Sequence, residues 1–65
     1  MDNSYQDRVV QEKSELDTKM KGLQVFIETN ESFKTLAEEE KRDLSEQLNI
    51  MRHYSMVLQS RINRF

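Results

Sequence analysis

Hydrophobic side chains recur along the first half of the chain at alternating steps of four and three residues, the spacing of one face of an α-helix. This first seam contains Val9, Leu16, Met20, Leu23 and Ile27. Gln6 and Lys13 fall on the same face near the beginning of the segment. The pattern therefore predicts a helix over about residues 4–28 that is polar along the seam at its N-terminal end and apolar toward its C-terminal end.

A second seam with the same spacing predicts another helix over about residues 36–63. It contains Leu44, Leu48, Met51, Ser55, Leu58, Ile62 and Phe65. Beside it runs an outer stripe, which contains Ile50, Tyr54, Val57 and Arg61. One partner helix covers one seam, so the outer stripe needs a further surface. The most economical surface is another copy of the chain, and we expect a homo-oligomer.

Polar residues between the two seams predict a connection over about residues 29–35, because Thr, Asn and Ser compete with helix by bonding to the backbone. Asn3 or Ser4 is the expected start of the first helix, with Asp7 at the reciprocal position of a capping box. Thr35 is the expected N-cap of the second helix, followed by acidic residues that suit the helix dipole. We predict an all-α fold, with residues 1–65 forming a single antiparallel two-helix hairpin that assembles into a helical homo-oligomer.

The composition narrows the ways in which so small a chain can become stable. With 65 residues it buries a limited core, and such scaffolds need disulfides, a metal or self-association. The chain has no cysteine and one histidine, His53, so disulfides and thiolate metal sites are excluded. No signal sequence and no apolar run of bilayer length is visible, and we expect a soluble intracellular protein without a membrane partner. A net charge of −2 argues against coating DNA.

Enzyme chemistry finds little support in the sequence. Without cysteine, and with a single histidine that lacks an evident orienting partner, no nucleophile–base set is formed. No glycine-rich loop is present to hold a phosphate. We expect a protein that is not an enzyme and uses no cofactor or metal.

Aromatic and cationic residues remain as candidates for binding, since rings stack on bases and cations meet phosphates. They are Tyr5, Arg8, Lys13 and Lys19 in the first helix and Arg52, Tyr54, Arg61 and Arg64 in the second. Simpler roles stay open for several of them. Tyr54 could be a core aromatic with its hydroxyl at the rim, Lys13 could extend its stem over the seam into water, and C-terminal arginines suit a helix dipole.

Three stretches carry a resemblance to a known family: "YQDRVVQEKSELDTKMKGLQVFI", "FKTLAEEEKRDLSEQLNIMRHYSMVLQSRI" and the terminal "NRF". Together they resemble the small phage proteins of the Acb/Tad hairpin type, nucleotide sponges that blunt the anti-phage systems CBASS and Thoeris. The resemblance is strongest to the anti-CBASS sponges, and it covers almost the whole chain.

The resemblance implies a helical oligomer, a hexamer, that acts in the host bacterial cytoplasm and binds cyclic oligonucleotides without cleaving them. Cyclic dinucleotides such as cyclic GMP-AMP would lie between protomers, with a tyrosine on the bases and a lysine at the phosphates. The matching positions are Tyr5, Arg8, Lys13 and Lys19, of which either lysine could contact phosphate. Cyclic trinucleotides would bind where several hairpins meet, at Arg61, Arg64 and Tyr54.

Symmetry is consistent with this arrangement, because a cyclic dinucleotide suits a two-fold axis and a cyclic trinucleotide a three-fold axis. The alternative function is a non-enzymatic helical hairpin that docks on another protein through its outer stripe. An accessory role in transcription is less favoured, because no recognition helix with a basic face is apparent.

Overall fold

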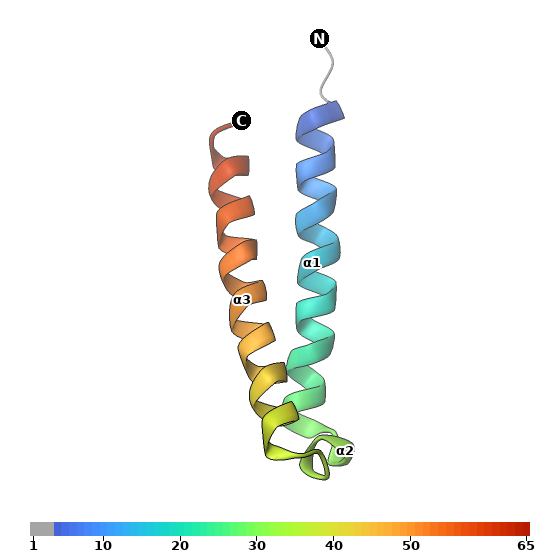
Figure 1. Cartoon of the computed structure of the whole chain (residues 1–65). Helices are drawn as coiled ribbons and strands as arrows, with labels where there is room; N and C mark the ends of the chain where they lie inside the picture. The colour runs from blue at the N-terminus through green and yellow to red at the C-terminus, as the bar shows by residue number, and fades with distance from the viewer. Residues whose placement is uncertain (1–3) are drawn as a thin grey trace.

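The computed structural model describes residues 4–65 as two long antiparallel helices joined by a short one. Helix α1 spans Ser4–Thr29, α2 spans Glu31–Lys34 and α3 spans Glu38–Asn63. The helices form a rod about 52 Å long, with the beginning of α1 and the end of α3 at the same end (Figure 1). The all-α hairpin is thus confirmed. We call the end with the termini the open end and the end with α2 the closed end.

The two predicted seams face each other along the rod. Val9, Leu48 and Leu58 are buried, and Leu58 is only 1% exposed. Ser55, a polar position of the second seam, is also buried, and the remaining positions are half-buried except for Phe65, which is 43% exposed at the open end. A two-helix hairpin has one layer of contact, so few side chains can be covered on all sides. The outer side of each helix is left to solvent.

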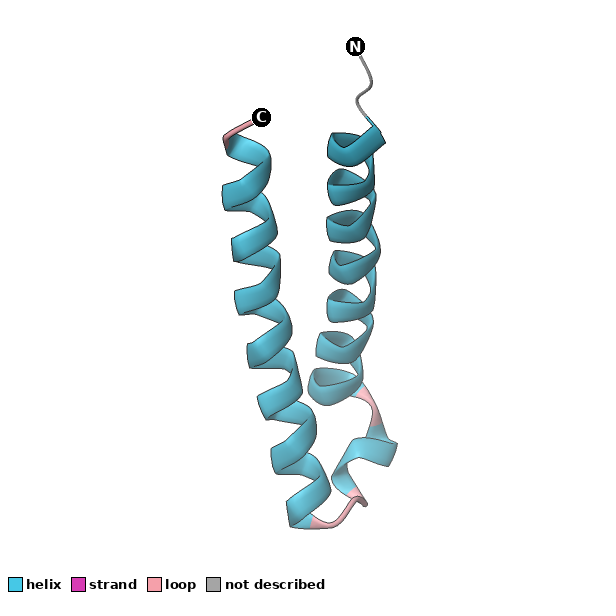
Figure 2. Cartoon of the chain, turned by 45° about the horizontal axis from the view of Figure 1, so that its top comes forward, coloured by secondary structure: helices cyan, strands magenta, loops and turns pink. Residues whose placement is uncertain are grey.

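The closed end is more regular than the sequence pattern predicts (Figure 2). Asn30 interrupts the helix, and its side-chain oxygen accepts a hydrogen bond from the Ser32 N–H at 2.8 Å, so that it caps α2. Most of the expected connection is therefore helical. Thr35 lies at the end of α2, where its hydroxyl donates to the Ser32 carbonyl at 2.8 Å. The prediction that Thr35 caps the second long helix is wrong, because Thr35 terminates the turn that Asn30 begins.

Helix α3 begins at Glu38, two residues later than expected, after Ala37 in an extended conformation. Ala37 has no side chain that could cap, so the first turn depends on its three glutamates, which the helix dipole favours there. At the other end of the chain, Asp7 lies in the first turn of α1, while Asn3 lies outside the described residues. No helix in residues 4–65 combines the length and the hydropathy needed to span a bilayer.

Candidate functional site

An aromatic and cationic cluster lies at the open end, where the two long helices bring together residues from both ends of the chain. The Arg61 Nη2 donates a hydrogen bond to the Tyr5 hydroxyl oxygen at 3.2 Å, and the guanidinium carbon lies 5.9 Å from the centre of the Tyr5 ring. The Phe65 ring is 6.0 Å from the same ring at an angle of 55°. Tyr5 is nevertheless 53% exposed. The cluster is ordered by its neighbours and still open to a ligand.

The charge of Arg61 is stabilised by these contacts. The hydrogen bond to Tyr5 is the largest cause that raises the pKa of the Arg61 guanidinium, and the nearby Glu12 adds attraction. A hydrogen bond to a neutral hydroxyl leaves the positive charge of Arg61 unpaired. The guanidinium also keeps further N–H donors for an anion. The arrangement thus presents a fixed cation beside an exposed aromatic ring.

Tyr54 lies farther along α3 and is tied to α1 by its hydroxyl, which donates to the Glu12 carboxylate. The ring is 44% exposed on the outer stripe, so it does not fill the core, although its hydroxyl has a partner at the edge. Glu12 thus holds Tyr54 and lies near Arg61. Its carboxylate connects the stripe of α3 to the side of α1 that carries Tyr5.

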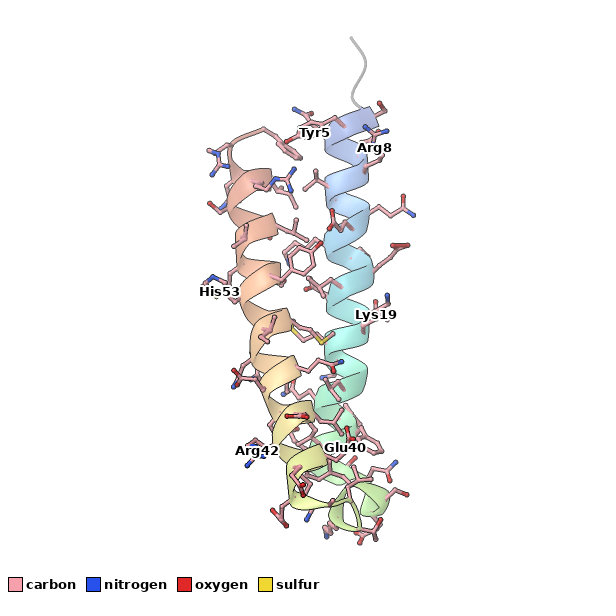
Figure 3. All side chains as sticks on the ribbon, viewed as in Figure 1. Tyr5, Arg8, Lys19, Glu40, Arg42 and His53 are labelled. Atoms are coloured by element: carbon pink, nitrogen blue, oxygen red, sulfur yellow. The ribbon has the colours of Figure 1, made fainter. Side chains whose placement is uncertain are left out.

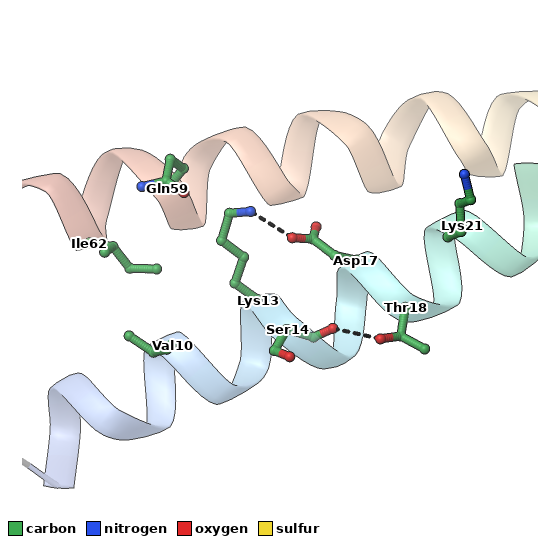
Figure 4. Close-up of a pocket in the computed structure, with 8 residues that line it drawn as sticks. All are labelled: Val10, Lys13, Ser14, Asp17, Thr18, Lys21, Gln59 and Ile62. Carbon is green, nitrogen blue, oxygen red and sulfur yellow. Dashed lines mark hydrogen bonds and ion pairs between the residues drawn. The ribbon is translucent and has the colours of Figure 1, made fainter.

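Lys13 is engaged within the hairpin and is not a free cation. Its ammonium lies 2.6 Å from the Asp17 Oδ2, one turn farther along α1, and its side chain is 21% exposed (Figure 4). The other oxygen, Asp17 Oδ1, accepts a hydrogen bond from the buried Ser55 hydroxyl of α3 at 2.6 Å. These bonds, with Lys13 as the larger cause, lower the pKa of Asp17. The polar break in the first seam is therefore part of a network that joins the two helices.

A groove of about 660 Å³ runs along this network, between the two long helices. Its walls include Val10, Lys13, Asp17 and Lys21 of α1 and Gln59 and Ile62 of α3 (Figure 4). A smaller hollow of about 380 Å³ on α1 includes Lys19. Tyr5 lines neither of them.

The residues predicted to bind cyclic dinucleotides do not all lie on the same side of α1. Tyr5, Arg8 and Lys19 are separated by three and eleven residues, which places them on one side of a helix with 3.6 residues per turn. Arg8 and Lys19 both project away from α3 (Figure 3). Lys13 turns instead toward Asp17 and the groove. Of the two lysines, Lys19 is the one without an ion pair among the described residues.

The predicted trinucleotide residues lie on α3 or, in the case of Arg64, at its C-cap, and they differ in their contacts. Arg61 is tied to Tyr5, which the sequence assigns to the other ligand, and Tyr54 is tied to Glu12. Arg64 is exposed in the last turn, where its Nη1 donates to the Ser60 hydroxyl at 3.2 Å. The structure thus joins one residue from each predicted site in a single cluster.

Sequence reasoning missed two polar residues of the network and groove, Asp17 and Lys21, whereas Glu12 was one of the acids considered as a partner of Arg61. A signal for Asp17 was present, because it follows Lys13 by four residues and can therefore pair with it on a helix. Ser55 at a seam position, where an apolar side chain is expected, was a second signal for a polar contact between the helices. The partnership of Glu12 with Tyr54 needed the tertiary structure, since 42 residues separate them.

Comparison with known proteins places the chain in one family. Residues 3–64 match the family model described as Sequestin. No curated protein and no solved structure gives a significant match. The match extends over both long helices and the closed end, so it includes every residue of the clusters and networks described above except Phe65. The chain therefore belongs to the Sequestin family.

Proposed function

We propose that this Sequestin-family hairpin sequesters cyclic oligonucleotides without cleaving them. The ligands would be cyclic dinucleotides such as cyclic GMP-AMP and cyclic trinucleotides. The protein would thereby withdraw the second messengers of CBASS-type signalling in a phage-infected bacterial cytoplasm. The family name suggests a protein that sequesters something, and the resemblance to phage sponges supplies the class of ligand.

The observation that carries the proposal is the Tyr5–Arg61 cluster. An exposed tyrosine ring offers a face for a base, and a guanidinium with free donors lies 5.9 Å from its centre. Stacking is worth about 1–3 kcal/mol per base, and an arginine fork suits phosphate oxygens. A ring and a cation held together in this way, from opposite ends of the chain, are well arranged for a nucleotide.

Binding between copies is supported by the distance between the candidate residues within one hairpin. Tyr5 and Lys19 share a side of α1, but fourteen residues of helix separate them by about 21 Å along the axis. A second copy can bring its own lysine to the tyrosine of the first. The outer stripe supports self-association as well, because Ile50 is 61% exposed and Val57 47% exposed. We propose a homo-oligomer, a hexamer by resemblance.

The test is titration calorimetry of the purified chain with a panel of cyclic di- and trinucleotides and with linear dinucleotides as controls. We expect tight binding of at least one cyclic ligand and recovery of that ligand intact after prolonged incubation. Chromatography of the released ligand detects cleavage. Absence of heat across the whole panel would refute the proposal, and a cleaved product would refute sequestration without catalysis.

The exposed outer stripe also favours a second candidate function, a hairpin that docks on a different protein. In that case the panel of nucleotides produces no heat and the chain remains a 7.8 kDa monomer in light scattering until a partner is added. The two measurements together separate the two functions.

A further inference from the structure

The outer stripe of α3 is longer than its apolar part. Ile50, Tyr54 and Val57 form the centre and are 44–61% exposed. Continued toward the N-terminus by the same steps of three and four residues, the stripe passes through two exposed acids, Asp43 and Glu40. Arg42 and His53, by contrast, lie on the outer side of α3 away from α1 (Figure 3). Glu40 and Asp43 therefore extend the apolar stripe, whereas the other acids of α3 lie outside it: Glu38, Glu39 and Glu46.

Continued toward the C-terminus, the stripe passes through two arginines, Arg61 and Arg64. Helix α3 thus carries negative charge at one end of the stripe, apolar side chains in the middle and positive charge at the other end. Reversing the direction of the helix places each acid opposite an arginine: Glu40 opposite Arg64 and Asp43 opposite Arg61. The charges along the stripe are therefore complementary to those of a second copy of the stripe that runs in the opposite direction.

The residues in the middle of the stripe pair with the same symmetry. The two charged pairs are both centred on residue 52, and so are two further pairs of the stripe, Gln47 with Val57 and Ile50 with Tyr54. In an antiparallel pair of helices with a seven-residue repeat, positions related in this way lie in the same layer of contact. The two-fold axis repeats each of the four pairs, so the interface has eight layers of contact, and each layer is filled by two different side chains.

We propose that two copies of the hairpin associate through α3 in antiparallel orientation, about a two-fold axis near Arg52. The proposal rests on the self-association proposed above and does not depend on nucleotide binding. The apolar centre supplies the burial. The charged ends select the orientation, because parallel pairing would place acid against acid and arginine against arginine.

None of the four charged residues of the stripe has an oppositely charged partner at ion-pair distance within residues 4–65 of one hairpin, although Glu12 attracts Arg61 from a longer distance. Asp43 and Arg61 are eighteen residues apart, which is about 27 Å along a helix. The three ion pairs in residues 4–65 use none of the four charged residues of the stripe. Arg61 is bonded to the neutral hydroxyl of Tyr5. A second copy provides carboxylates at the height of both arginines.

Disulfide trapping tests the orientation directly, because the chain has no cysteine of its own. Positions 47 and 57 are about 15 Å apart along one helix, so a cysteine at either position meets its own copy only in a parallel pair. In the antiparallel pair, the new cysteine of a Gln47→Cys copy lies opposite the new cysteine of a Val57→Cys copy. We expect Gln47→Cys and Val57→Cys to remain monomeric in a non-reducing gel when oxidised separately and to form a dimer when mixed.

A dimer of Gln47→Cys alone that forms as readily as the mixed dimer would overturn the antiparallel orientation. Absence of any dimer in the mixture would overturn the pairing of these stripes. The outcome is independent of the nucleotide titration. A trapped dimer that binds no cyclic nucleotide refutes only the proposed function, whereas a nucleotide-binding protein without this dimer refutes only the interface.

Charge reversal provides a second test with a built-in control. Asp43→Arg and Arg61→Asp should each weaken association at least tenfold, because two ion pairs, each worth up to about fivefold, are replaced by repulsion. Mixing the two variants restores both pairs, since the first carries only arginine and the second only aspartate at these positions. Sedimentation should show recovery in the mixture. Two variants that remain dissociated when mixed would contradict the pairing.

Discussion

Two aromatic pairs, one at each end of the hairpin, have the same separation and opposite surroundings. At the closed end the Phe26 and Phe33 ring centres are 6.0 Å apart in an edge-on arrangement, and both side chains are half-buried. At the open end the Tyr5 and Phe65 ring centres are also 6.0 Å apart, but the two residues are 53% and 43% exposed. The closed pair joins residues seven positions apart, whereas the open pair joins residues sixty positions apart.

The two aromatic pairs differ in how much ring surface they bury and in when they can form. The closed pair covers a tight turn whose closure costs little chain entropy, and it excludes water from the start of the hairpin. The open pair forms only when the whole hairpin is assembled, and it leaves ring surface in solvent beside the Arg61 guanidinium. Under the proposed function, this exposed ring surface is the face available to a base.

The largest expected effect is on ligand binding at the open end. Tyr5→Ala removes one stacking face from each copy, at about 1–3 kcal/mol per base. Two copies at one cyclic dinucleotide would lose a hundredfold or more in affinity. Calorimetry measures the affinity, and circular dichroism should show an unchanged helix content. An unchanged affinity would remove Tyr5 from the site.

Arg61→Ala tests whether cyclic dinucleotides and cyclic trinucleotides bind through different residues. We expect loss of trinucleotide binding, because the cation on the outer stripe is removed from every copy. Dinucleotide binding should weaken by only a few-fold, through release of the Tyr5 hydroxyl. Titration of one variant with both ligands measures the two effects, at a protein concentration at which sedimentation shows the variant to be assembled despite the loss of the proposed Asp43 pair. Equal loss for both ligands together with dissociation would show instead that Arg61 acts through assembly.

At the closed end, Phe33→Ala should reduce the free energy of unfolding by about 2 kcal/mol, less than the 3–5 kcal/mol of a fully buried phenylalanine. Urea unfolding followed by circular dichroism gives the value. The matched variant is Tyr5→Ala, which should unfold close to the native midpoint. If Phe33→Ala bound nucleotides more weakly than Tyr5→Ala, the assignment of roles to the two ends would be reversed.

Asn30→Ala tests the cap that orders the closed end. Loss of the bond from the Ser32 N–H to the side chain should cost about 1 kcal/mol. Asn49→Ala, at an exposed position inside α3, is the control, and it should unfold at the native midpoint or slightly above it because alanine favours helix. Equal losses in both variants would show that the Asn30 side chain does not cap.

The smallest expected effect concerns pH and the network between the two ends. The pKa of Asp17 is lowered in the folded state below its ordinary value of about 3.9. Its contribution to stability is therefore complete above about pH 4 and is lost as the pH falls through the folded pKa. Asp17→Asn should be less stable at pH 7 and should lose less stability on acidification. The exposed Glu46→Gln is the control, which should follow the native acid profile in thermal melts.

Much of the fold was predictable from the sequence, because the helical period of the apolar residues is a local property. Both seams and the exposed outer stripe follow from the spacing of side chains on a helix. The failure at Thr35 is also local. Asn30 and Thr35 both have side chains that can cap, and only the chain path shows that Asn30 begins a short helix that Thr35 ends.

The candidate site depended on the tertiary structure to a greater extent. The sequence pointed to Tyr5, Lys13 and Arg61 as residue types that suit a nucleotide. It could not pair Tyr5 with Arg61, because contacts across fifty-six residues depend on the register of the two helices. For the same reason it could not show that the Ser55 hydroxyl of the opposite helix donates to Asp17, although the four-residue spacing of Lys13 and Asp17 did indicate their ion pair. Side-chain type is encoded residue by residue, whereas the partner of each charge is decided by the packing of one helix on the other.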